Sequence, residues 1–216
     1  MGKGFSGFVI SFAISGLGFL LPMWMIGKLP GLSQNIPFQG FMLILFCWVW
    51  IEAAFANHQS VNSRRERIWR FAFFWMIYAG LIISLVYFAN GPLQANFALT
   101  WLGLLLSSLG VLLRYLSIRS LGKFFTYELR IDPDQRVIER GPYRYVRHPG
   151  YAGILSLLAG LPLIFQNWYG LLWLGVVCGS FMIVRIPHEE RMLIEAFGDD
   201  YRKYMKRTKR LIPFLY

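Results

Sequence analysis

Charged residues are scarce in this sequence. Asp, Glu, Lys and Arg together make up 15% of the 216 residues, whereas hydrophobic residues make up 56%, and the mean hydropathy is +0.46. A soluble domain ordinarily carries about 25% charged residues. The deficit excludes an ordinary soluble domain, and we expect an all-α integral membrane protein built as a multi-span helical bundle.

Acidic residues are the rarer kind of charge. Only 11 Asp and Glu stand against 22 Lys and Arg, for a formal net charge of +11. In a soluble chain such an excess indicates nucleic-acid binding, but here the basic residues gather between and after apolar runs. The loop NSRRERIWR holds four arginines, whereas GKLPGLSQNIP holds one lysine and NGPLQAN none. Because basic loops stay in the cytoplasm, we expect both termini and segment 117–149 there, no nucleic-acid partner and, in a bacterium, the plasma (inner) membrane.

Cysteine and the familiar catalytic motifs are also nearly absent. The two cysteines, Cys47 and Cys178, lie inside apolar runs, so they suit small buried hydrophobes and supply neither a disulfide framework nor a thiolate metal set. No GxxxxGK[ST], HExxH, GxSxG or strand-linked GxGxxG occurs. P-loop hydrolysis, zinc proteolysis, serine hydrolysis and Rossmann cofactor binding therefore lack support, and we expect no metal.

Long apolar runs are what the sequence does contain. A membrane-spanning helix needs roughly 20 apolar residues, and four runs come near that length. They are Phe5–Ile26, Phe38–Phe55, Phe71–Ala89 and Phe97–Tyr115. Two shorter runs, Tyr151–Phe165 and Tyr169–Val184, are separated by QNW. They are short for full spans and predict either a tight helical hairpin or a re-entrant pair sheltered by protein, and we favour the short hairpin. No small-residue cleavage site follows the first run, so we expect it to be retained. The bundle therefore has about six apolar segments.

Three polar groups carry the remaining information. They are Arg114 at the end of the fourth run, the cluster GPYRYVRHPGYAG at Gly141–Gly153, and the stretch Arg185–Arg207. In the last stretch, apolar side chains recur at steps of four, four and three, at Leu193, Phe197, Tyr201 and Tyr204. This spacing predicts a C-terminal amphipathic helix that closes over the cytoplasmic end of the bundle. Pro187 suits its first turn, where Glu189 and Glu190 favour the helix dipole.

Each of these residue types has an ordinary structural explanation. An arginine costs on the order of 3 kcal/mol at the membrane centre, so Arg114 and Arg185 either reach the interface or find a polar partner. His148 alone is more typical of an interfacial histidine than of a catalyst. The prolines of the cluster suit helix boundaries, and its arginines suit cytoplasmic anchors. None of these explanations accounts for the order in which the residues occur.

That order resembles a known family. The cluster Gly141–Gly153, an apolar hairpin and EERMLIEAFGDDYRKYMKRTKRLIP are similar to the isoprenylcysteine carboxyl methyltransferase family and its phospholipid methyltransferase relatives. The family pattern is G-x-Y-x-x-x-R-H-P-x-Y-x-G, a hairpin, and E-E-x-x-L-x-x-x-F-G-x-x-Y-x-x-Y. The resemblance covers Leu112–Pro213. The sequence has no long linker, repeat or low-complexity tract, so we expect one membrane-embedded domain over 1–216. The resemblance divides it into a spanning scaffold at 1–111 and a catalytic half at 112–216.

The resemblance also implies a cytosol-facing site for S-adenosyl-L-methionine. Substrate-carboxylate arginines fall on Arg114 and Arg185. Cofactor contacts fall on Gln135, Arg136, Val137, Ile138, Tyr143, His148, Pro149, Gly150, Tyr151 and Glu189. We expect the other substrate to be a lipid or isoprenoid-like molecule that arrives from the bilayer.

Elementary chemistry agrees with carboxyl O-methylation of an isoprenylcysteine-like acceptor. Methyl transfer from a sulfonium is an in-line displacement that needs positioning more than a metal or a covalent nucleophile. A carboxylate is already ionised at neutral pH and needs only cations to orient it, which a forked arginine does bidentately.

Three alternatives stay open. Phospholipid N-methylation would need a base such as His148 or a buried glutamate to take the proton of the amine. Membrane sterol reductases carry a similar R-H-P-x-Y-x-G segment and bind a nicotinamide cofactor there. An inactive lipid-binding scaffold is the third.

Overall fold

The computed structural model describes residues 36–56, 79–80, 83–84, 96–126, 130–132 and 134–212. The named elements within these ranges are α2 (Ile36–Ala56), α4 (Phe97–Leu121), η2 (Gly122–Phe124), η3 (Gly141–Arg144), α5 (Pro149–Ile164), α6 (Trp168–Phe197) and α7 (Asp199–Arg207). All are helices, so the all-helical expectation is confirmed for this part of the chain. The expected span Phe5–Ile26 and most of Phe71–Ala89 lie outside the described residues.

Two of the described helices are long and apolar enough to cross a membrane: Phe97–Phe124, which joins α4 to η2, and Trp168–Phe197. Shorter apolar stretches form most of α2 and the whole of α5. The four helices α2, α4, α5 and α6 coincide with four of the six expected apolar segments. α6 has 30 residues, which makes it about 45 Å long. It therefore exceeds the roughly 30 Å thickness of the hydrocarbon core.

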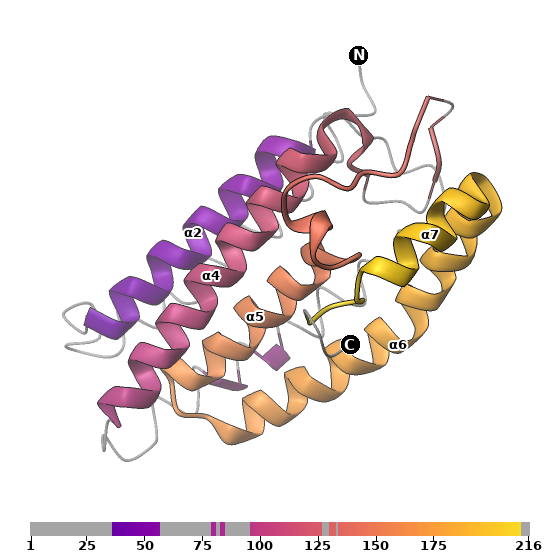
Figure 1. Cartoon of the computed structure of the whole chain (residues 1–216). Coiled ribbons are helices and arrows are strands. Elements are labelled where there is room, and N and C mark those ends of the chain that lie inside the picture. Colours follow the sequence, from indigo (N-terminus) through magenta and orange to yellow (C-terminus); the bar gives the residue numbers. More distant parts are fainter. Residues whose placement is uncertain are drawn as a thin grey trace, which may run out of the picture.

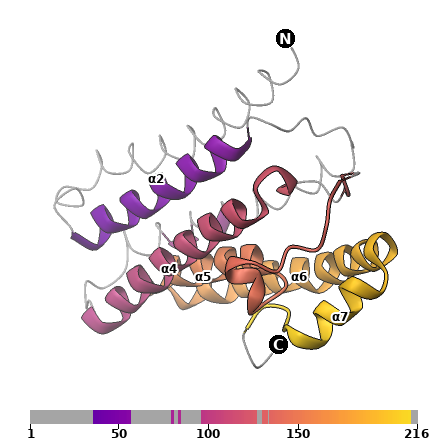
Figure 2. The same cartoon turned by 45° about the horizontal axis from the view of Figure 1, so that its top comes forward.

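α4 lies between α2 and α5 (Figures 1 and 2), and it packs closely against α5. An added Cβ on Gly103 would lie 2.6 Å from the carbonyl oxygen of Gly160, and one on Gly153 would lie 2.8 Å from that of Gly110. The Ser156 hydroxyl donates a hydrogen bond to a backbone carbonyl of α4 at 2.8 Å. Small residues and interhelical hydrogen bonds drive helix association in lipid, where the hydrophobic effect gives no preference. These contacts therefore fix the position of α5 relative to α4.

A tight turn joins α5 to α6. Gln166 has φ 52°, and Asn167 caps α6 by accepting hydrogen bonds from the backbone N–H groups of Tyr169 and Gly170, each at 3.1 Å. Asparagine is a favoured N-cap because its side chain satisfies donors that the first turn leaves open. The predicted helical hairpin at QNW is confirmed, but its second arm is not short, because α6 has 30 residues. Figure 1 shows α5 and α6 diverging from this turn.

The expectation that a separate helix begins near Pro187 is wrong. α6 runs without a break from Trp168 to Phe197 and carries Pro187 in its interior. The reason lies in its buried face, which continues past the proline in steps of four residues. The members of this face are Gly170, Leu174, Cys178, Met182, Ile186 and Glu190. Packing along this continuous face outweighs the proline's missing hydrogen bond.

The predicted amphipathic face is real but is divided between two helices. Leu193 and Phe197 belong to the end of α6, whereas Tyr201 and Tyr204 are the buried residues of α7. Gly198 separates the helices with φ 55°, a left-handed conformation that glycine adopts at little cost. The chain thereby turns back, so that α7 faces the loop before α5 (Figure 2).

The segment after α7 returns to that loop. Val146 and Lys209 form a parallel β-bridge, the backbone N–H of Arg147 donates to the carbonyl of Lys209 at 2.7 Å, and that of His148 donates to the carbonyl of Arg210 at 3.0 Å. In Figure 1 this tail lies between the diverging ends of α5 and α6. The C-terminal segment thus holds the start of α5 from the outside.

Candidate active site

A cavity of about 230 Å³ lies where α2, α4, α5, α6, α7 and the extended strip before η3 meet. Its lining includes both charged and apolar side chains. The predicted residues that line it are Arg114, Gln135, Arg136, Val137, Ile138, Tyr143, His148, Gly150, Tyr151, Arg185 and Glu189. Pro149 does not line the cavity; it is buried as the first residue of α5. The structure therefore brings the residues of the two motifs and both arginines together.

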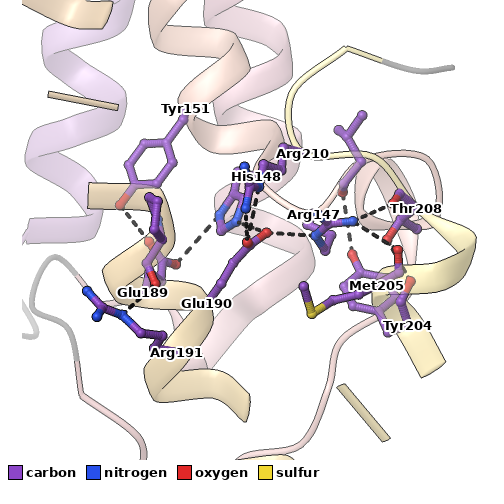
Figure 3. Close-up of polar contacts among 12 residues, drawn as sticks. Arg147, His148, Tyr151, Glu189, Glu190, Arg191, Tyr204, Met205, Thr208 and Arg210 are labelled. Carbon is purple, nitrogen blue, oxygen red and sulfur yellow. Dashed lines mark hydrogen bonds and ion pairs between the residues drawn. The ribbon is translucent and has the colours of Figure 1, made fainter. Parts of the chain in front are cut away.

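Tyr151 links α5 to α6 inside the cavity. Its hydroxyl donates to the Glu189 carboxylate at 2.7 Å and accepts from Nε of Arg185 at 3.3 Å. Figure 3 shows the ring of Tyr151 reaching toward Glu189. Because Arg185 and Glu189 lie one helical turn apart on α6, a single phenol orients both a cation and a carboxylate. The continuation of α6 through Pro187 makes this arrangement possible.

His148 lies between the two neighbouring glutamates of α6. It is 5% exposed, its Nε2 lies 3.4 Å from Oε1 of Glu190, and its Nδ1 lies 3.9 Å from Oε1 of Glu189. Its ring stacks on that of Tyr151 with centroids 5.7 Å apart. The imidazole therefore has a carboxylate on each of its two nitrogen sides.

Glu190 is the centre of a buried ion-pair network. It is 3% exposed. Its carboxylate accepts from Arg147 Nε at 2.8 Å and from Arg210 Nη2 at 2.9 Å, and it faces His148 (Figure 3). The guanidinium of Arg147 also donates to the backbone carbonyls of Met205 and Thr208. Glu190 thereby connects α6 with the loop before α5 that carries Arg147 and His148, here called the motif loop, and with the tail after α7 that carries Arg210. The helix-dipole interpretation of Glu190 missed this role.

A second ion pair reaches the cavity from α2. Arg114 is 8% exposed, and its Nε and Nη2 donate to Oε1 and Oε2 of Glu52 at 2.8 and 3.3 Å. The indole of Trp48 donates to the same carboxylate at 3.2 Å. Sequence reasoning passed over Glu52, although a signal existed. It is the only charged residue within Ile36–Ala56, and a charge inside an apolar span needs a partner.

The aromatic residues of α7 close the outer side of the site. The Tyr204 hydroxyl donates to the carbonyl of Tyr143 at 2.6 Å. Burial raises the pKa of the Tyr143, Tyr201 and Tyr204 phenols, because the charged phenolate is poorly solvated there. The negative charge of Glu189 raises the pKa of Tyr143 further. These phenol hydroxyls therefore stay protonated. They donate hydrogen bonds or form an uncharged part of the cavity lining.

The arrangement offers positioned charges rather than metal ligands. Among the described residues, no group of three or more His, Cys, Asp or Glu side chains is placed to hold a metal ion. The cavity instead sets five arginines and two glutamates beside aromatic and aliphatic side chains. A lining that combines charged and apolar side chains can bind ligands with both polar and apolar groups.

These features define a class: an intramembrane, multi-pass helical protein with a mixed-charge ligand cavity at the ends of its helices. The chain belongs to the isoprenylcysteine carboxyl methyltransferase family. The model of that family matches residues 101–195, and the family expected from the motifs is confirmed.

Curated plant proteins are among the relatives. A protein named protein-S-isoprenylcysteine O-methyltransferase B, from Arabidopsis thaliana, is 30% identical over 136 residues, which cover 62% of this chain and 68% of the relative. A rice protein (Oryza sativa subsp. indica) with the name probable protein-S-isoprenylcysteine O-methyltransferase is 30% identical over 125 residues. That match covers 57% of this chain and 65% of the rice protein. The chain therefore spans slightly less than two thirds of the rice relative's length.

A solved structure shows the same fold. The eukaryotic intramembrane Ras methyltransferase ICMT superposes with a TM-score of 0.63 at 20% sequence identity. The superposition covers 99% of this chain and 94% of that structure. The likeness extends beyond the segment that the family model matches, since that model begins at residue 101.

Proposed function

We propose that this protein transfers a methyl group from S-adenosyl-L-methionine to the carboxylate of an isoprenylcysteine-like, lipidated acceptor. One observation carries the proposal: a single cavity holds His148, Tyr151 and Glu189 of the two motifs together with Arg114 and Arg185. The names of the plant relatives support this class of acceptor.

The lining suits the chemistry of the cofactor. S-Adenosylmethionine carries an ammonium, a carboxylate, ribose hydroxyls and a planar base. The cavity offers the Glu189 carboxylate, arginine cations and the rings of Tyr143 and Tyr151. It also offers a close backbone approach at Gly150, where an added Cβ would lie 3.0 Å from Nη1 of Arg114. When bound, the cofactor supplies an electrophilic methyl group on its sulfonium sulfur.

We assign cofactor binding to the ten positions expected from the motifs. Nine of them line the cavity, namely Gln135, Arg136, Val137, Ile138, Tyr143, His148, Gly150, Tyr151 and Glu189. Pro149 acts indirectly, because it starts α5 and fixes the backbone between His148 and Gly150.

The acceptor is held by two different parts of the lining. The side chains of Trp48, Ile154 and Phe181 give an apolar surface for a lipid chain. Arg114 and Arg185 supply forked cations that orient a carboxylate. Tyr151 holds Arg185 in place, since its hydroxyl accepts from Nε at 3.3 Å. These residues perform positioning, which is most of what an in-line displacement requires.

Direct binding tests the cofactor assignment. Calorimetric titration of the purified protein with S-adenosylmethionine and separately with NADPH distinguishes a methyltransferase from a reductase, and a scaffold would bind neither. We expect heat only with S-adenosylmethionine, and weaker binding in the Glu189→Ala variant. Unchanged affinity in both Glu189→Ala and His148→Ala would reject the site.

Phospholipid N-methylation is the second candidate, and one observation favours it. Nδ1 of His148 lies 3.9 Å from Oε1 of Glu189, so an imidazole supported by a carboxylate is available as a base for an amine. Methyl transfer to a prenylated thioether carboxylic acid and to phosphatidylethanolamine decides between the two. If only the phospholipid is methylated, carboxyl methylation is rejected and phospholipid N-methylation becomes the proposed function.

We further propose that the site opens to the cytoplasm and that 1–216 acts as one domain. Loop charges support the orientation, because the motif segment 117–149 is basic. Within the proposed division, 112–216 carries most of the lining. The scaffold 1–111 contributes Trp48 and Glu52.

A further inference from the structure

α2 contributes one charge to the site, and its placement demands an explanation. Glu52 belongs to a helix whose other residues are uncharged, and it precedes the segment that the family model matches, which begins at residue 101. A carboxylate in an apolar helix is costly unless it is paired. Glu52 is paired with Arg114, and both side chains line the cavity.

The guanidinium of Arg114 is held from three sides. Along one edge, Nε and Nη2 donate to the two oxygens of Glu52 at 2.8 and 3.3 Å. The ring of Phe125 lies against it, with 5.3 Å from the guanidinium carbon to the ring centroid. The Nη1 corner lies beside Gly150, where a Cβ would come within 3.0 Å. Bidentate pairing fixes the plane of a guanidinium as well as its position.

The carboxylate of Glu52 is itself oriented. Nε1 of Trp48, one helical turn earlier on α2, donates to Oε1 at 3.2 Å. That oxygen also accepts from Nε of Arg114. A chain of hydrogen bonds therefore runs from α2 through Glu52 to Arg114 on α4. It ends beside Gly150, the second residue of α5.

We propose that Glu52 is a positioning residue for the acceptor site: it holds Arg114 in the plane from which that arginine meets the acceptor carboxylate. The inference rests on the proposed function for its catalytic consequence. The structural part of the inference, that Glu52 fixes the position of Arg114, does not depend on the proposed function. Glu52 reaches the site through Arg114, which the proposed function assigns to the acceptor carboxylate, so we expect Glu52 to affect acceptor turnover more than cofactor affinity.

The first measurement needs no activity. In the detergent-solubilised full-length protein, phenylglyoxal modifies accessible arginines, and mass spectrometry gives the rate at each one. We expect Glu52→Gln to raise the rate at Arg114 at least fivefold, because one bidentate partner is lost. Arg147, which is held by Glu190, serves as the internal reference and keeps its rate. An unchanged rate at Arg114 overturns the proposal, and so does an equal rise at both arginines, which would indicate general loosening.

The second measurement gives the catalytic consequence. With the prenylated thioether acid as acceptor, we expect Glu52→Gln to lower kcat/KM at least tenfold while the S-adenosylmethionine dissociation constant stays within twofold of wild type. Glu52→Asp, which keeps the charge, should recover part of the loss. Glu195→Gln, a change of an exposed acid outside the cavity, is the matched control.

The outcomes separate the two proposals. A purely structural role for Glu52 would lower cofactor affinity and acceptor turnover together and would overturn the inference. If wild type fails to methylate the acceptor while Glu52→Gln still exposes Arg114, the proposed function fails and the structural assignment of Glu52 holds.

Discussion

At the scale of single residues, burial decides which charges matter. Arg147 and Glu190 have side-chain exposures of 9% and 4% at an N–O distance of 2.8 Å. Arg202 and Asp199 lie at a similar N–O distance, 2.9 Å, but have side-chain exposures of 59% and 80%. Removing one partner of a buried pair leaves an uncompensated charge, while solvent screens an exposed pair. The two pairs therefore make a matched comparison.

We expect Glu190→Gln to lower the free energy of unfolding by about 3 kcal/mol. The variant leaves Arg147 and Arg210 without their shared carboxylate, and the tail should detach from the motif loop. Thermal unfolding in detergent measures the loss. Asp199→Asn is the control and should show almost none. Equal stability of the two variants would contradict the network role of Glu190.

Arg185 tests the nature of the acceptor at the same scale. A lysine keeps the charge but loses the planar fork, so Arg185→Lys should lower carboxyl methylation at least tenfold. Wild-type rates should stay level from neutral to mildly alkaline pH, because a carboxylate acceptor needs no base. A methylation rate that rises with pH, together with an unchanged rate in Arg185→Lys, would indicate an amine acceptor instead.

At the scale of elements, close approach of two helices positions the site. Gly103 of α4 meets the backbone of α5, where an added Cβ would lie 2.6 Å from both the Gly160 carbonyl oxygen and the Ile164 nitrogen. Backbone atoms cannot yield as a side chain can, so α4 and α5 must separate to admit a methyl group. Arg114 lies on α4 and His148 directly precedes α5, so the two side chains would move apart with the helices.

Gly103→Ala should therefore destabilise the protein by roughly 1 to 3 kcal/mol, and it should weaken cofactor binding at a distance. Gly175→Ala on α6 is the control, because its added Cβ meets nothing within 4 Å, and alanine favours a helix. Melting temperatures of both variants in one detergent give the comparison. A Gly103→Ala protein as stable as wild type would show that the helix pair can relax.

The junction of α7 with the motif loop responds to alkaline pH. Burial raises the pKa of Tyr201 and Tyr204 above the ordinary value, which is about 10 in an unfolded chain. The folded state therefore holds these protons more tightly, and the resulting stability is present below about pH 10 and is lost as the pH rises further. We expect level stability from pH 7 to 9 and a fall beyond about pH 10.

Tyr204→Phe separates this effect from general alkaline denaturation. The variant loses the hydrogen bond to the Tyr143 carbonyl, which is 2.6 Å long in the wild type, and should be about 1 kcal/mol less stable at pH 7. Its decline above pH 10 should be shallower, since one titrating phenol is gone. An identical decline in both proteins would assign the alkaline transition to other groups.

At the scale of the whole molecule, the charge distribution predicts orientation. Basic loops predict that the motif segment faces the cytoplasm. Tyr145 is 60% exposed within this segment, so it is a better probe position than buried His148. In a protein with Cys47 and Cys178 replaced, Tyr145→Cys should resist an impermeant reagent added to intact cells, whereas Gln34→Cys should react. Labelling of Tyr145→Cys from outside would show that the orientation is opposite to the predicted one.

Much of the site was predictable because most of its polar residues belong to short sequence motifs. His148, Tyr151 and Glu189 belong to two patterns with a fixed separation, and they meet in one cavity with Arg114 and Arg185. Apolar runs of sufficient length likewise predicted α2, α4, α5 and α6, since lipid leaves a backbone few options other than a helix. These features depend on local composition and order, which the sequence by itself determines.

Tertiary structure decided what depends on distant neighbours. Helix continuation through Pro187 follows from a buried face whose partners lie elsewhere in the chain, and no local signal outweighs the proline. Glu190 appeared to serve a helix dipole, but its partners Arg147 and Arg210 lie 43 and 20 residues away. Glu52 meets Arg114 across 62 residues. A sequence shows that a buried charge needs a partner, but only the packed helices determine which partner it has.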